Sequence, residues 1–114
     1  MAIDSKVLEP GTAVVTLSGR LVFGKDIEQL ESIVKDLLQQ GQKRVILDAE
    51  GLDYADSSGI GTLVACLTQI KNAGGEMKVA SANPRIRRLL NMTGVDQLIA
   101  LYSTVAEAAA AGRP

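Results

Sequence analysis

The sequence predicts an α/β fold built on a mixed sheet of four to five strands, with a leading β-hairpin and about four helices. From residue 26 onward the apolar pattern alternates in the order helix, strand, helix, strand, helix, strand, helix. Strands joined by crossover helices are parallel, with right-handed connections. Before residue 26, two strand-like stretches flank a turn that contains Pro10 and Gly11, which predicts an antiparallel pair and therefore a mixed sheet. A chain of 114 residues suits one core, so residues 1–114 are expected to form a single domain.

The first half of the chain supplies the hairpin, one helix and one buried strand. Asp26 is the predicted N-cap of the helix, and Gly41 closes it as a C′ glycine. The strand that follows is apolar without alternation, as expected when both faces of a strand are covered. The predicted strands are residues 2–7, 13–17 and 44–47, with a short extended piece at 19–24. The inward face of the helix is expected to carry Ile27, Leu30, Ile33, Val34, Leu37 and Leu38.

The second half continues the alternation of helices and strands. Its first helix begins at residues 56–58 and stops near Gly74. Asn83 is the predicted cap of the next helix, with Pro84 in the first helical position. The remaining elements are a strand at 77–80, a helix ending at 93–94, a strand at 98–102, a helix opened by a capping box at 104–107 and a frayed tail at 112–114. The buried stripe of the helix after residue 58 is expected to be Ile60, Leu63, Val64, Ala65, Cys66, Leu67 and Ile70.

The composition excludes several kinds of function. The chain has no histidine, so a Ser-His-Asp triad is impossible, and its single cysteine excludes an internal disulfide. A zinc site would need Cys66 with carboxylates alone, so neither a metal nor a cofactor is expected. The net charge of −1 argues against general electrostatic attraction to nucleic acid or anionic membrane. No apolar run reaches the roughly 20 residues that span a bilayer, and the first residues lack a signal peptide's apolar stretch, so a cytoplasmic protein is expected.

Asp56, Ser57 and Ser58 are the most distinctive feature, because they stand at the exposed start of a helix with Gly59 and Gly61 behind them. The first N–H groups of a helix lack partners and carry partial positive charge. One interpretation is structural: these side chains cap the helix, and the glycines allow close packing. The other is regulatory: a phosphoserine adds roughly −1.5 to −2 charges, which a helix N-terminus tolerates but a docked partner does not. The junction alone leaves both open.

Residues 56–61 resemble the signature of bacterial anti-sigma factor antagonists, members of the STAS domain family. Further segments fit the family in the right order over nearly the whole chain, namely 19–21, 45–48, 72–75 with 77–79, and 87–94. The resemblance implies that Ser57, with Ser58 as the second choice, is the phosphorylation site. It also implies that Asp56, Gly59 and Ile60 belong to the partner-binding surface.

The same resemblance implies a partner switch. The unphosphorylated protein would bind an anti-sigma factor that is also a serine kinase, and so free the sigma factor. The kinase would then phosphorylate the serine and disengage, and a serine phosphatase would reset the protein. On this interpretation the chain is a bacterial kinase substrate rather than an enzyme, without a nucleic-acid partner, and it acts as a monomer or weak dimer.

One position departs from the family pattern. Many antagonists carry an acidic residue where this chain has Val22, which is followed by Phe23 and Gly24. This segment is expected beside the switch loop, where the apolar pair either contacts a partner or packs inward. Arg85 belongs to the basic cluster at 85–88, which is expected either to form a solvated helix face or to meet an acidic partner surface.

Three alternatives compete with the switch. A nucleotide site lacks the Gly-Lys-Ser/Thr of a P-loop. A serine hydrolase lacks both the Gly-x-Ser-x-Gly elbow and a histidine base. Within the family, some domains are non-switching adaptors in signalling scaffolds or lipid-transport complexes, in which the serines would be plain helix caps.

Overall fold

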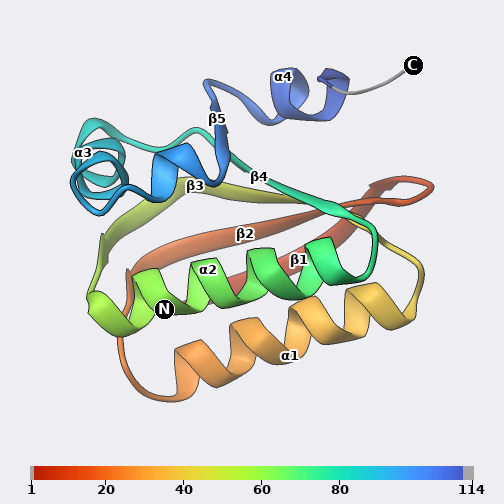
Figure 1. The fold of residues 1–114 in the computed structure, drawn as a ribbon, viewed down its shortest axis with the longest axis horizontal. Coiled ribbons are helices and arrows are strands. Elements are labelled where there is room, and N and C mark those ends of the chain that lie inside the picture. Colours follow the sequence, from red (N-terminus) through yellow and green to blue (C-terminus); the bar gives the residue numbers. More distant parts are fainter. Residues whose placement is uncertain (1, 112–114) are drawn as a thin grey trace.

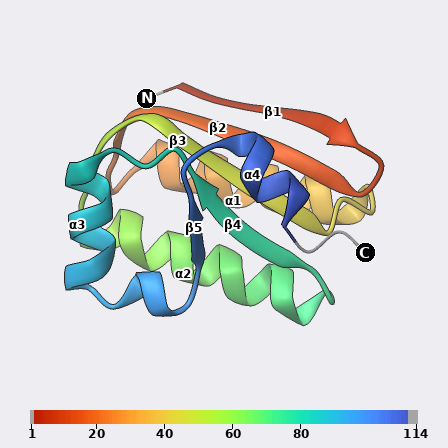
Figure 2. The same cartoon turned by 90° about the horizontal axis from the view of Figure 1, so that it is seen from above.

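Five strands form one mixed sheet in the computed structural model, which describes residues 2–111 (Figure 1). The spatial order is β1-β2-β3-β4-β5, with β1 antiparallel to β2 and every other pair parallel. Figure 2 shows β1 along one edge of this sheet. The strands are β1 (Ala2–Glu9), β2 (Thr12–Leu21), β3 (Arg44–Ala55), β4 (Glu76–Ala80) and β5 (Ala100–Tyr102). The predicted mixed sheet with a leading hairpin is confirmed.

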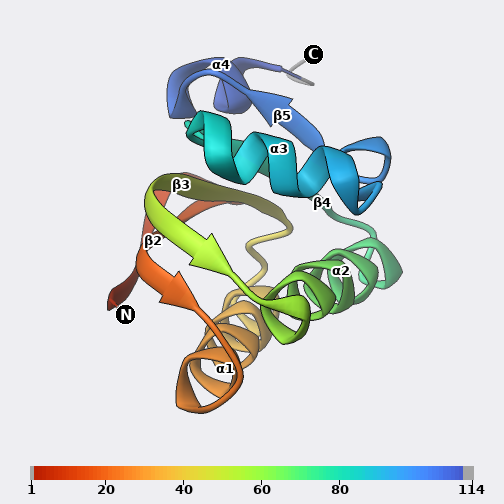
Figure 3. The same cartoon turned by 90° about the vertical axis from the view of Figure 1, so that its left-hand side faces the viewer.

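Four helices connect or follow these strands. They are α1 (Lys25–Gln39), α2 (Ser57–Asn72), α3 (Pro84–Met92) and α4 (Val105–Ala110), with a 3-10 turn at Val95–Gln97. Figure 3 shows α1 and α2 on one side of the sheet and α4 on the other. The main core contains the buried faces of α1 and α2, and a smaller cluster lies beneath α4. That cluster consists of Val14, Ile46, Ala80, Ala108 and Ala109.

The first helix begins two residues earlier than predicted. Its N-cap is Gly24, not Asp26, and Gly24 makes no side-chain cap. The backbone at Gly24 has φ 132° and ψ −150°, a conformation that a residue with a Cβ rarely adopts. Asp26 lies instead in the first turn, where its carboxylate favours the positive end of the helix dipole. Gly41 follows the end of the helix with φ 82°, as the sequence predicts.

Strand β3 is much longer than the four residues, 44–47, predicted for it. It continues from Leu47 to Ala55, because β2 also continues and pairs with it up to Leu21 opposite Ala55. Register shifts interrupt the pairing between Thr16 and Ser18 and again after Gly19. These irregularities, together with exposed polar residues in the second half of β3, hide the strand from a pattern-based prediction.

The last strand is shorter than predicted, and one residue of α2 faces the other way. The strand was predicted at 98–102, but only Ala100–Tyr102 pairs with β4. The preceding turn buries Val95 and Ile99, which explains the apolar signal there. Ala65 is exposed, whereas the rest of the predicted α2 stripe is buried or partly buried. The predicted frayed tail at 112–114 lies outside the described residues.

The single cysteine and the lengths of the helices each limit what the chain can do. Cys66 is buried, and burial followed by the negative charge of Glu31 raises the pKa of its thiol to about 11, so the thiol is a packing group. None of the helices in residues 2–111 combines the length and apolar character needed to cross a bilayer.

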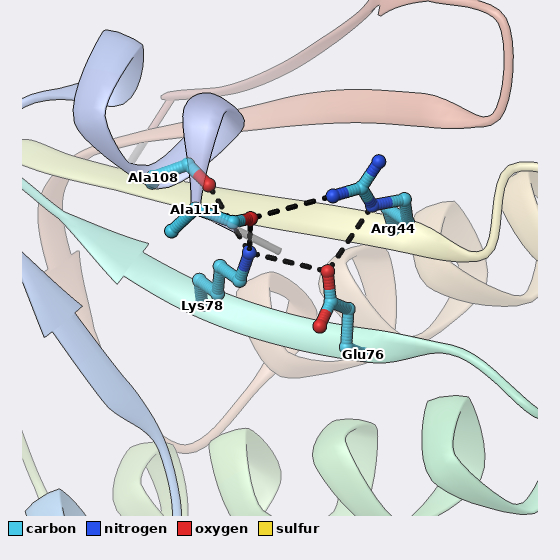
Figure 4. A network of polar contacts seen from close by, with 5 residues as sticks. All are labelled: Arg44, Glu76, Lys78, Ala108 and Ala111. Carbon is cyan, nitrogen blue, oxygen red and sulfur yellow. Dashed lines mark hydrogen bonds and ion pairs between the residues drawn. The ribbon is translucent and has the colours of Figure 1, made fainter. Parts of the chain in front are cut away.

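Helix α4 is held against the sheet by buried and half-buried charges (Figure 4). The Nζ atom of Lys78, which is 7% exposed, donates to the carbonyl oxygens of Ala108, at 3.2 Å, and Ala111. Arg44 also donates to the Ala111 carbonyl, at 3.3 Å. Glu76 Oε1 lies 3.1 Å from both cations and balances their charge. The last carbonyls of α4 thus receive cationic partners, which suits the negative end of a helix.

This network predicts a pH-dependent contribution to stability. Burial raises the pKa of Glu76, but hydrogen bonds and positive charge from Lys78 and Arg44 outweigh it and leave the pKa below 4.5. A lowered pKa in the folded state gives stability that is present above the unfolded value and lost as pH falls through the folded value. We therefore expect Glu76→Gln to lower the urea midpoint at neutral pH, and we expect this difference from the wild type to shrink as the pH falls through the folded-state pKa of Glu76. The exposed Glu50→Gln is the matched control, and a Glu76→Gln effect that does not change with pH would contradict the assignment.

Candidate functional site

The site forms where β2 and β3 end side by side. Leu21 pairs with Ala55 at the carboxyl ends of these parallel strands. The Asp56 N–H donates to the Leu21 carbonyl oxygen at 3.2 Å, so the pairing extends one residue further. Figure 3 looks onto this end, where β2 leads into α1 and β3 leads into α2. The segments 22–24 and 56–58 are therefore neighbours, as the sequence analysis expected.

The carboxylate of Asp56 ties these two segments together. Its Oδ1 atom accepts the Gly59 N–H at 2.8 Å, which caps α2. Its Oδ2 atom accepts the Phe23 N–H at 3.0 Å, which fixes the connection between β2 and α1. The hydrogen bond from Phe23, followed by that from Gly59, lowers the pKa of Asp56, so the side chain stays charged in mildly acidic solution. Asp56 therefore has a definite structural role.

Ser57 is the first residue of α2 and its side chain is exposed. No hydrogen bond joins its hydroxyl to another residue between positions 2 and 111. Because Asp56 already caps the helix, the Ser57 hydroxyl is left open to solvent. Ser58 is only partly exposed, and its carbonyl oxygen accepts a hydrogen bond from the Thr62 hydroxyl at 2.9 Å. Of the two serines, Ser57 is the more accessible to another protein.

Gly59 and Ile60 lie behind the serines rather than on the surface. Both are buried, and a Cβ built on Gly59 would stand 2.3 Å from the Leu21 carbonyl oxygen. Glycine at 59 thus lets α2 approach β2 closely. Gly59 and Ile60 follow Ser57 in the first turn of α2, but their side-chain positions face the interior, and their assignment to a partner-binding surface stays a prediction.

The segment 22–24 gives the site its exposed apolar side chain. Phe23 is 82% exposed, and Val22 is partly buried. Gly24 supplies the turn into α1 described above. Of the two possibilities left open for the apolar pair, Phe23 takes the surface position. The structure thus brings Phe23, Asp56 and Ser57 together at one end of the sheet.

Arg85 stands apart from these residues, in the first turn of α3. It lines a groove between α3 and the end of β3, together with Tyr54 and Met92, which sequence analysis did not select. The signal for these two residues was weak, since Tyr54 lies in a polar stretch and Met92 lies at the end of a helix. Within residues 2–111, no three histidine, cysteine, aspartate or glutamate side chains come together as metal ligands.

The fold and the position of this site define the class of protein. The STAS domain model matches residues 5–108, and the chain belongs to the STAS domain family. The anti-sigma F factor antagonist of Paenibacillus polymyxa is 31% identical over 93 residues, which cover 81% of this chain and 79% of that protein.

Solved structures of the same class share the architecture. The Bacillus cell fate determinant SpoIIAA in its phosphorylated form aligns with a TM-score of 0.77 and 23% identity, over 98% of this chain and 100% of that one. An anti-sigma-factor antagonist (STAS) domain protein from Planctomyces limnophilus aligns with a TM-score of 0.77 and 27% identity, over 93% of each chain. These likenesses place the five-stranded sheet and the α2 junction within a known fold.

Proposed function

We propose that this protein is an anti-sigma factor antagonist controlled by phosphorylation of Ser57. The unphosphorylated form binds an anti-sigma factor that is also a serine kinase, and the sigma factor is released. Phosphorylation separates the antagonist from the kinase, and a serine phosphatase restores the binding form. The protein is then a substrate of both enzymes in the bacterial cytoplasm, not an enzyme itself.

The observation that carries this proposal is the exposure of the Ser57 hydroxyl at a helix start that is already capped. A kinase needs a reachable hydroxyl, and Ser57 is exposed without a hydrogen-bond partner among the described residues. The N-terminus of α2 carries partial positive charge, which favours a phosphate there. The fold can therefore accept the phosphate, while a partner seated over the same end meets new bulk and charge.

The similar proteins support the proposed antagonist function. The Paenibacillus polymyxa relative is an anti-sigma F factor antagonist, and the Bacillus relative was solved in a phosphorylated form. The exposed Phe23 beside Ser57 offers an apolar contact for a partner. On this proposal, that contact takes the place of the acidic side chain that the family resemblance leads one to expect at position 22, where this chain has Val22. A partner that reads Ser57 would also cover Phe23.

Intact mass spectrometry tests this function directly. The protein is incubated with ATP and a serine-kinase anti-sigma factor from the same bacterium, and the product is mapped by peptide fragmentation. We expect one phosphoryl group, located on Ser57, and none on Ser57→Ala. The Ser58→Ala variant is the matched control and should be modified as fully as the wild type. Modification that persists in Ser57→Ala, or none in the wild type, would contradict the proposal.

A further inference from the structure

A narrow groove opens beside the switch, between the end of β3 and helix α3. Its walls are Asp53 and Tyr54 on β3 and the residues Arg85, Ile86, Arg88, Leu89 and Met92 on α3. Its volume is about 230 Å³. Tyr54 precedes Ser57 by three residues, and the α2 N-cap lies between them. A protein docked over Ser57 would therefore have this groove within reach.

The groove places apolar side chains at the surface. Ile86 is buried and Leu89 is partly buried, and they form its inner part. Met92 is 72% exposed and Tyr54 is 43% exposed, which places both among the few large apolar side chains that the described chain leaves open to solvent. Tyrosine and methionine are enriched at protein contacts, because each offers a large apolar surface that adapts to a partner. This pair marks a contact surface rather than a solvated helix face.

Positive charge surrounds the groove although the chain as a whole carries a net charge of −1. Arg85 and Arg88 are exposed, and neither pairs with a carboxylate within residues 2–111. The Arg20 guanidinium lies 5.0 Å from the centre of the Tyr54 ring. Asp53 is the one acidic residue of the wall. Two arginines in the wall against one aspartate, with Arg20 close to the Tyr54 ring, favour a partner that brings carboxylates.

The size of the groove selects the kind of occupant. Pockets for drug-sized molecules measure about 300–1,000 Å³, so a groove of about 230 Å³ is small for such a ligand. It is suited to a single side chain of a partner protein. In protein interfaces a few such anchoring side chains supply most of the binding free energy, and the contacts around them contribute little. Surrounding arginines would pair with acidic residues next to that side chain in the sequence of the partner.

We infer that this groove receives one large apolar side chain from an acidic segment of the protein that reads Ser57. The inference rests on the proposed function only for the identity of that protein. The groove itself is a second contact point, formed by the end of β3 and by α3, whereas Phe23 lies in the connection between β2 and α1. It gives the switch partner a fixed anchor that phosphorylation does not alter.

Nuclear magnetic resonance titration of the isotope-labelled full chain tests the groove without the kinase. The probe is a synthetic pentapeptide with one leucine between two pairs of glutamates, blocked at both ends. We expect saturable shifts at the amides of Tyr54, Leu89 and Met92, with a Kd on the order of 1 mM. Control peptides carry serine in place of leucine, or lysines in place of the glutamates, and neither should shift these amides.

Two variants and a matched control locate the binding. Met92→Glu and Arg88→Glu should each weaken peptide binding roughly tenfold, because one removes the apolar wall and the other reverses the charge. Val7→Glu changes a side chain that is 52% exposed on the edge strand and should leave binding unchanged. If Ser57 is phosphorylated but the peptide does not bind, the groove inference is wrong and the proposed function stands. If the peptide binds but Ser57 is not phosphorylated, the proposed function is wrong and the groove inference stands.

Several outcomes would overturn the inference. These are equal binding of the leucine and serine peptides, shifts confined to other surfaces, and no shifts at about 5 mM peptide. Sedimentation with phosphatidylglycerol vesicles that is lost in Arg88→Glu would assign the arginines to a membrane surface instead of an acidic protein.

Discussion

Ser57→Asp is expected to weaken binding of the anti-sigma partner at least about a hundredfold, which corresponds to about 3 kcal/mol. The substitution places a permanent carboxylate where the hydroxyl is exposed at the first position of α2. A negative charge there favours the helix dipole, so the fold is retained and the loss arises in the complex. Isothermal titration calorimetry measures the effect, and thermal unfolding should show a melting temperature no lower than that of the wild type.

Two control variants separate charge at the site from charge in general. Ser57→Ala removes the hydroxyl without adding charge and should bind within a few-fold of the wild type. Ser32→Asp adds the same carboxylate at an exposed serine of α1 and should leave the affinity unchanged. If Ser57→Asp and Ser57→Ala bind equally well, the chain is a non-switching adaptor and the regulatory proposal is wrong.

Gly59→Ala is expected to destabilise the fold strongly, with a loss of about 3 kcal/mol. The new methyl group would stand 2.3 Å from the Leu21 carbonyl oxygen and 3.1 Å from its carbon. Both are backbone atoms of a central strand, so α2 must move away. That movement also disturbs the hydrogen bond from the Gly59 N–H to Asp56. Urea unfolding followed by circular dichroism gives the change as a shift of the midpoint at constant slope.

Gly61→Ala provides the matched control two residues further along the same helix. A Cβ at Gly61 has no atom within 4 Å, and the position is exposed. Replacing a helical glycine by alanine there should stabilise the protein by about 0.5–1 kcal/mol. Opposite signs for the two substitutions would show that close packing, rather than helix propensity, fixes glycine at 59. A destabilisation by Gly61→Ala as large as that by Gly59→Ala would contradict this explanation.

The fold was largely predictable because its helices and strands have strong local signals. The cap at Asn83, the proline after it and the glycine after α1 all lie where the sequence predicts. The failures occur where long-range pairing decides the structure. The second half of β3 is polar and irregular, and only its neighbour β2 makes it a strand. Gly24 is the N-cap of α1 because the chain must turn there with a positive φ. The pattern of apolar residues in the helix gives no sign of this turn.

The site was predictable in part. The motif placed Ser57 at the start of α2, but it did not distinguish which residue caps the helix. In the structure Asp56 takes that role by accepting the Gly59 N–H. Its second hydrogen bond, from the Phe23 N–H, joins residues that are 33 positions apart, so a local sequence pattern could not reveal it. The groove beside Tyr54 depends on where α3 packs against β3, so a linear pattern could not reveal it.

The division of labour between Asp56 and Ser57 has an evolutionary consequence. The Asp56 carboxylate makes the hydrogen bonds that hold this end of the fold, and the Ser57 hydroxyl makes none within residues 2–111. Selection can therefore exchange position 57 for alanine, threonine or a permanent acid with little risk to folding. Under the proposed function, one substitution at position 57 would make regulation of this protein constitutive or abolish it, and descendants of such a domain could diverge in signalling while their fold stays the same.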